Sequence, residues 1–177
     1  MANDLRNWLE ELTDKIPGYS GYAGRERRRD QDKLHREHIA NRLRAMKAPL
    51  TDVVRDLSSS GRLMEVGPVD RLLKKLDQIE NRVRFAAYGY AGFFDVVKIE
   101  DTHLESIHQF DLALAEQAGE LETLARGLKG RAASADELKS AAAELESAVD
   151  RFNQQFDERH RAINDYDQDP SRGVFSS

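Results

Sequence analysis

The stretch 102–128, THLESIHQFDLALAEQAGELETLARGL, decides the fold class. Its apolar positions recur every three or four residues, which places them on one face of an α-helix. Thr102 and Glu105 have the spacing of a capping box, in which each side chain bonds the backbone N–H of the other residue. We therefore predict a long amphipathic helix that needs other helices to cover its apolar face. The stripe consists of Leu104, Ile107, Asp111, Leu114, Ala118, Leu121, Ala125 and Leu128.

Helical periodicity of the same kind fills most of the remaining chain. We expect long helices over about 25–57, 68–90 and 134–169, and a short helix over 4–15. Pro49 should kink or restart the first of these, because proline lacks an N–H and crowds the preceding turn. No stretch alternates apolar and polar residues over a useful length. The predicted fold class is all-α, an antiparallel up-down four-helix bundle of long helices plus one short N-terminal helix.

Composition excludes several classes of protein. The chain of 177 residues has no cysteine, so a disulfide scaffold, a thiolate zinc site and a cysteine nucleophile are impossible. Its 27 Lys and Arg residues are outnumbered by 32 Asp and Glu residues, which gives a formal net charge of −5. Phosphate contacts need a net basic face, so we expect no nucleic acid partner.

Length and hydropathy indicate one domain. We expect 1–169 to form a single helical domain and 170–177 to be a frayed tail. No stretch approaches the roughly 18 apolar residues of a membrane span. The first eight residues lack the basic and apolar regions of a secretory signal. These patterns predict a cytoplasmic protein without a transmembrane segment.

The unusual residues gather at one end of the predicted bundle. Because successive helices alternate in direction, the loops 16–24 (IPGYSGYAG) and 88–95 (YGYAGFFD) fall at the same end. We call this end, which carries both loops, the aromatic end. The five histidines fall there too: His35, His38, His103, His108 and His160.

Aromatic and basic side chains at the aromatic end predict a surface that binds another protein. The run 25–29, RERRR, opens a helix, where the helix dipole disfavours cations, and such a break of a local rule can mark function. Two alternatives are that acidic residues pair with this run and that the aromatic loops fold back as a lid. The predicted partner-binding residues are Tyr19, Tyr22, Arg27, Arg28, Arg29, Tyr88, Tyr90, Phe93 and Phe94.

Asp111 falls at a core position of its helix, and Asp32 falls on the apolar stripe of the 25–57 helix. A buried carboxylate must be paired or hydrogen-bonded, since a lone buried charge is very costly. The alternative is that these carboxylates contact a ligand. We predict a buried polar network of Asp32, Arg36 and Asp111, with Arg28, Arg29, His35, His108 or a loop tyrosine as further partners.

A metal site is the alternative function. Glu105 and His108 have the Glu-x-x-His spacing that di-iron helical bundles use. Orientation counts against the site, because Glu105 points away from the apolar stripe of its helix. Unless iron or manganese binds there, we expect no cofactor. The candidate ligands are Glu105, His108, Asp111, Asp32 and His35.

Two segments together resemble an uncharacterised family of small bacterial helical proteins. They are the IPGY-x-GY motif at 16–22, followed by a basic helix start, and the YGYAG-x-FD motif at 88–95. The resemblance covers roughly residues 12–125. Genes of this family are sometimes found near those of SPFH (band-7) membrane-scaffold proteins. The resemblance implies a bacterial cytoplasmic origin and an accessory role, and it supplies no catalytic residues.

These patterns favour a non-enzymatic interaction or scaffold module. No P-loop, Gly-x-Ser-x-Gly elbow or His-Glu-x-x-His motif is present. We expect the aromatic end to bind another protein, with a membrane-associated scaffold protein as one candidate. A metal-binding di-iron-like bundle is the alternative function. A homo-oligomer with a purely structural role is a third hypothesis.

Overall fold

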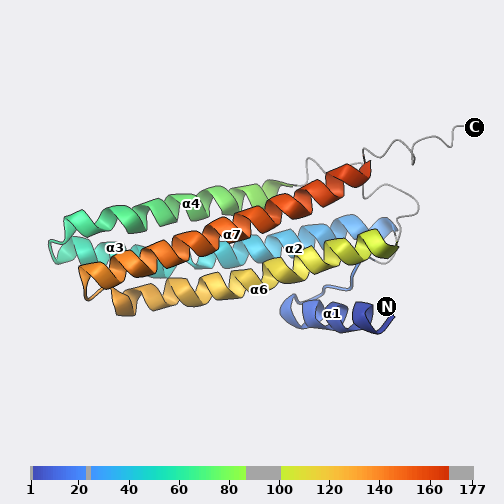
Figure 1. Ribbon diagram of the computed structural model, residues 1–177, viewed down its shortest axis with the longest axis horizontal. Helices are drawn as coiled ribbons and strands as arrows, with labels where there is room; N and C mark the ends of the chain where they lie inside the picture. The colour runs from blue at the N-terminus through green and yellow to red at the C-terminus, as the bar shows by residue number, and fades with distance from the viewer. Residues whose placement is uncertain (1, 23–24, 87–100, 168–177) are drawn as a thin grey trace, which may run out of the picture.

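The computed structural model describes residues 2–22, 25–86 and 101–167, and its regular structure in these ranges is entirely helical (Figure 1). The all-α prediction is therefore confirmed. The loop 88–95 and the tail 170–177 lie outside the described residues. The elements are α1 (Ala2–Lys15), α2 (Arg25–Ala45), α3 (Lys47–Ser59), the 3-10 helix η1 (Leu63–Glu65), α4 (Val66–Phe85), α6 (Asp101–Arg131) and α7 (Ala135–Asp167).

The predicted 25–57 helix is divided into α2 and α3. Met46 lies between the two helices, and Pro49 occupies the first turn of α3. The first N–H groups of a helix have no intrahelical acceptor, so the N–H that proline lacks costs little there. Pro49 thus restarts the helix, which is one of the two outcomes that the sequence predicted.

The long helices form two antiparallel pairs that lie side by side. One pair is α2 and α3 with α4, and the other is α6 with α7. The two pairs meet where α6 contacts α2 and α3, and where α7 contacts α4. His35 and Arg42 of α2 reach Asp111 and Glu122 of α6, in the same order along both helices. Helices α2 and α6 are therefore parallel.

The neighbouring helices α4 and α7 are also parallel, as the order of their paired residues shows. Lys75 pairs with Asp150, and Arg82, further along α4, pairs with Asp157, further along α7. The sequence argument predicted antiparallel neighbours, because short connections force consecutive helices together. Residues 86–100 between α4 and α6 are too many to impose that restraint. The antiparallel expectation therefore holds within each pair and fails between the pairs.

The apolar core runs the length of the molecule. Residues such as Leu50, Leu76 and Leu145 are fully buried in it. Helix α1 lies along α6 and adds Leu12 to the same core, and Ile16, directly after this helix, is buried there too. Burial of these stripes holds the helices together, since each methylene removed from water stabilises the fold by about 0.8 kcal/mol. None of the helices described combines the length and apolar character that crossing a bilayer requires.

Two leucines near the α3–α4 turn test this packing. Leu57 is 2% exposed and Leu63 is 66% exposed. We expect Leu57→Ala to lower the free energy of unfolding by about 2–5 kcal/mol, because it leaves a cavity in the core. Leu63→Ala should change it by no more than about 0.5 kcal/mol. Urea denaturation measures both, and equal losses in the two variants would contradict the described packing.

Candidate functional site

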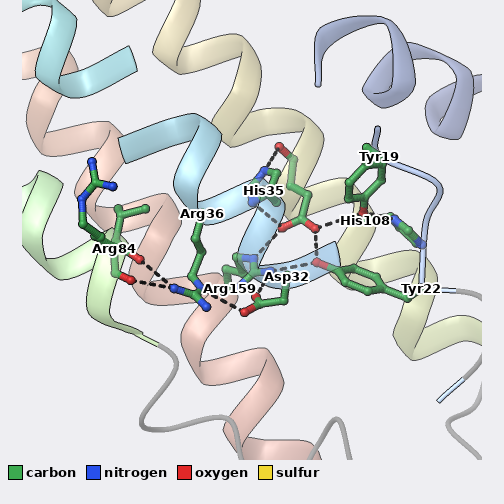
Figure 2. Close-up of polar contacts among 10 residues, drawn as sticks. Tyr19, Tyr22, Asp32, His35, Arg36, Arg84, His108 and Arg159 are labelled. Atoms are coloured by element: carbon green, nitrogen blue, oxygen red, sulfur yellow. Dashed lines mark hydrogen bonds and ion pairs between the residues drawn. The ribbon is translucent and has the colours of Figure 1, made fainter. Parts of the chain in front are cut away.

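A cluster of buried polar side chains lies at the aromatic end (Figure 2). The loop between α1 and α2 supplies two tyrosines, α2 supplies three residues, α6 two and α7 one. All of them are almost inaccessible to solvent. We call this group the polar cluster; it consists of Tyr19, Tyr22, Asp32, His35, Arg36, His108, Asp111 and Arg159.

Asp111 is the centre of the polar cluster and is completely buried. Its Oδ1 accepts a hydrogen bond from Nε of Arg159 at 2.5 Å. Its Oδ2 accepts from the hydroxyls of Tyr22 at 2.5 Å and Tyr19 at 3.4 Å. A buried carboxylate is tolerated only when its charge and lone pairs are satisfied in this way.

Arg159 connects helices that are not direct neighbours. Besides Asp111 of α6, its Nη2 donates to Asp32 Oδ1 of α2 at 2.9 Å and to Tyr22 Oη at 3.0 Å. Helices α2 and α7 share no extensive contact among the described residues. The fully buried guanidinium therefore joins α2, α6 and α7 through the interior.

Arg36 extends the cluster to the end of α4. Its Nε donates to Asp32 Oδ2 at 2.8 Å, and its Nη1 donates to the Arg84 carbonyl at 2.8 Å. The last carbonyls of a helix lack intrahelical donors and carry partial negative charge, so a guanidinium stabilises them. Within the polar cluster, two guanidinium groups face two carboxylates, and their formal charges balance.

The two histidines of the cluster are held neutral by burial. Nε2 of His35 donates to the Asp111 carbonyl oxygen at 3.0 Å, since a carbonyl can only accept. Burial lowers the pKa of His35 despite the nearby Asp111 carboxylate. His108 Nδ1 and Tyr19 Oη share a hydrogen bond of 2.9 Å. Burial lowers the pKa of His108 to about 4, and Arg159 and His35 add to this shift against the opposing effect of Asp111.

The same surroundings fix the ionisation of the other groups. Burial alone would raise the pKa of Asp111, but Arg159 and the bond from Tyr22 hold that pKa below its usual value. Burial and the Asp111 charge raise the pKa of both Tyr19 and Tyr22. Near neutral pH, Asp111 is therefore ionised and both phenols remain hydrogen-bond donors.

Two glycines shape the loop that carries the tyrosines. Gly18 and Gly21 have φ angles of 85° and 78°, a region that side chains with a Cβ rarely adopt. A Cβ on Gly21 would also lie 2.9 Å from Leu9 Cδ1. Glycine at these positions lets the loop turn Tyr19 and Tyr22 inward.

Some of the predicted partner-binding residues are buried in the structure and others are exposed. Tyr19, Tyr22 and Arg28 are buried, so their predicted exposure to a partner is corrected. The two hydroxyls face inward because Asp111 needs donors, while Arg28 Nε lies 3.4 Å from the Tyr22 carbonyl oxygen. Arg27 and Arg29 are exposed, as a binding surface requires. The other predicted residues, Tyr88, Tyr90, Phe93 and Phe94, lie outside the described residues.

The predicted buried network and the structure share three residues. Asp32, Arg36 and Asp111 lie in the polar cluster with His35, His108 and two loop tyrosines, which are among the partners that the sequence suggested. Sequence reasoning missed Arg159. Its burial could have been predicted from its position in the sequence. Phe152, Phe156, Arg159 and Ile163 are separated by four, three and four residues, which puts all four on one face of α7.

The arrangement does not favour the predicted metal site. In the ranges that the structure describes, no group of three or more His, Asp or Glu side chains is placed to hold a metal ion. Arg159 instead takes the position between Asp32 and Asp111 that a cation would occupy. Glu105 is half-buried and has no contact with the cluster among the bonds described above.

No protein-family model, curated protein or solved structure matches this chain. The resemblance carried by the motifs at 16–22 and 88–95 therefore stays a prediction from the sequence.

The neutral histidines predict a fall in stability with acid. The pKa of His108 is about 4 in the folded chain and about 6.5 in an unfolded one, so the unfolded state takes up the proton first. The contribution of His108 to the free energy of unfolding is fully present above pH 7 and is lost as the pH falls toward 4. From this group we expect the free energy of unfolding to fall by about 2–3 kcal/mol between pH 7 and pH 4.5.

His108→Asn tests this assignment, because Asn keeps a polar atom near the position of Nδ1 and does not titrate. Urea denaturation at both pH values should show a loss about 2 kcal/mol smaller than in the wild type. His35 acts in the same direction and leaves a residual slope. The lowered pKa of Asp111 acts only at lower pH, outside this window. An unchanged pH dependence in the variant would contradict the assignment.

Proposed function

We propose that this chain is a non-enzymatic helical protein–protein interaction or scaffold module that binds its partner through the aromatic end. The observation that carries the proposal is the presence of two exposed arginines and one exposed phenylalanine at this end. Arg27 and Arg29 are exposed at the start of α2, and Phe85 is 59% exposed in the last turn of α4. Interfaces are enriched in arginine and aromatic residues.

The polar cluster supports this proposal by making the aromatic end rigid. Arg36 ties α2 to the Arg84 carbonyl, next to Phe85, and Arg159 ties α2 to α6 and α7. A surface on fixed elements loses little conformational entropy when it binds. The elements that carry Arg27 and Phe85 are therefore held ready for a partner.

Burial of the cluster favours a non-enzymatic role over catalysis. Catalytic groups must touch a substrate, yet Asp111 and Arg159 are completely buried and are satisfied by each other and by Asp32 and the tyrosines. The lowered pKa of Asp111 follows from this ion-pair network, because structural networks perturb pKa values as active sites do.

We propose a cytoplasmic protein whose partner is a membrane-associated scaffold protein, in line with the resemblance of its motifs. A self-associating homo-oligomer with a purely structural role is a separate hypothesis. For the fold, we propose an up-down four-helix bundle in which α2 and α3 together form one of the long rods, supported by the alternating direction within each helix pair.

A triple variant of the aromatic end tests the proposed function. We expect Arg27→Glu, Arg29→Glu and Phe85→Ser together to abolish capture of a stoichiometric partner from the native host, because they reverse the charge and remove the exposed ring. Mass spectrometry identifies the partner, and light scattering shows whether it is a second copy of the chain. Circular dichroism checks that helicity is retained.

The matched control places the same kinds of change at the opposite end. Arg55 and Arg126 are exposed there, and Leu63 has an exposure similar to that of Phe85. Arg55→Glu, Arg126→Glu and Leu63→Ser should leave capture intact. Equal capture by both triple variants, or loss in the control alone, would contradict binding through the aromatic end.

A further inference from the structure

Residues 2–22 are attached to the rest of the described molecule along one side. Helix α1 lies on the outer side of α6 in Figure 1 and shares an extensive contact with no other described helix. Leu12 and Ile16 are fully buried anchors of this segment. Because its helix packs extensively against α6 alone among the described helices, this segment can separate without any other helix having to move. We call α1 and the loop 16–22 the strap.

The strap is fastened by two tyrosine hydroxyls. Tyr22 donates to Asp111 and accepts from Arg159, and Tyr19 bonds His108 and Asp111. Smaller contacts join the strap to α2: the Ser20 amide donates to the Gln31 side chain at 2.7 Å, and Arg28 bonds the Tyr22 carbonyl. The strongest of these bonds end on the charged groups of the polar cluster.

The charged part of the cluster does not need the strap. Asp111 and Asp32 share Arg159, and Asp32 also binds Arg36, all from α2, α6 and α7. When the tyrosines leave, these four charges stay paired, and water can replace the lost hydroxyls. Loss of the strap therefore leaves no unpaired buried charge, the condition that makes breaking a buried ion pair so costly.

The loop contains conformational freedom on both sides of Tyr19. Gly18 and Gly21 adopt left-handed φ angles in the fastened state, and glycine can change to right-handed conformations without steric cost. Both glycines lie inside the strap, so they let the Tyr19 and Tyr22 side chains change direction once their hydrogen bonds are broken. The strap is thus a separable segment whose two fastening side chains can turn outward after release.

We infer that residues 2–22 are released as a unit from α2–α7 while these helices stay folded, the Tyr19 and Tyr22 hydroxyls acting as the fastening. Release uncovers the polar cluster and frees both tyrosine side chains to join Arg27, Arg29 and Phe85 at the aromatic end. This consequence for partner binding rests on the proposed function, whereas the release itself does not.

Hydrogen exchange of the full chain tests the inference at a single neutral pH. Leu128 is fully buried near the end of α6 remote from the strap. Leu128→Ala destabilises helices α2–α7, the body of the protein, and leaves the contacts of the strap unchanged. We expect it to accelerate exchange of protected amides in 145–156 of α7 by on the order of 100-fold or more. Amides in 9–16 of the strap should change less than 2-fold, because the strap is released before α2–α7 unfold.

A second variant tests the fastening. Tyr22→Phe keeps the ring and removes the hydroxyl, so the strap amides should exchange on the order of 10-fold faster. Equal acceleration of strap and α7 amides by Leu128→Ala, or an unchanged strap rate in Tyr22→Phe, would overturn the inference. Neither measurement needs a partner, so failure of the proposed function and failure of strap release are told apart.

Discussion

The ion pair between Arg159 and Asp111 is the interaction on which the aromatic end depends. Both side chains are completely buried, and two charges taken out of water cost several kcal/mol each unless their partners and hydrogen bonds are complete. This requirement explains why Asp32, Tyr22 and Tyr19 converge on the same point. Once Arg159 is buried, each neighbouring element must supply a group that satisfies it or its carboxylates.

The same pair specifies how the two helix pairs fit together. The apolar core consists mainly of aliphatic and alanine side chains, and such cores tolerate more than one way of packing. Arg159 reaches α2 across the interior, so a shift of α7 by one turn would separate it from both carboxylates. We therefore interpret the polar cluster as the group of residues that fixes the register between the two helix pairs. The same cluster supports the exposed surface around Phe85 and holds the strap in place.

Periodicity predicted the all-α class, and Asp111 was recognisable because it interrupts an apolar stripe. Its partner was harder to find, because an arginine on a charged helix is usually exposed and its long side chain reaches several positions. The parallel neighbours were missed since residues 86–100 leave the spatial order of α4 and α6 open. The sequence offered a loop tyrosine as a partner of the buried carboxylates, but loop composition alone did not show that such bonds bury both Tyr19 and Tyr22.

Two arginines on α7 give the most direct test of this account. Arg159 and Arg151 both pair with carboxylates of α6, but Arg159 is buried while Arg151 and its partner Glu120 are exposed. The account predicts that Arg159→Met lowers the free energy of unfolding by about 3–5 kcal/mol, because Asp111 stays buried without its cation. Arg151→Met should lower it by no more than about 1 kcal/mol. Small and equal losses in both variants would contradict the central role of the buried pair.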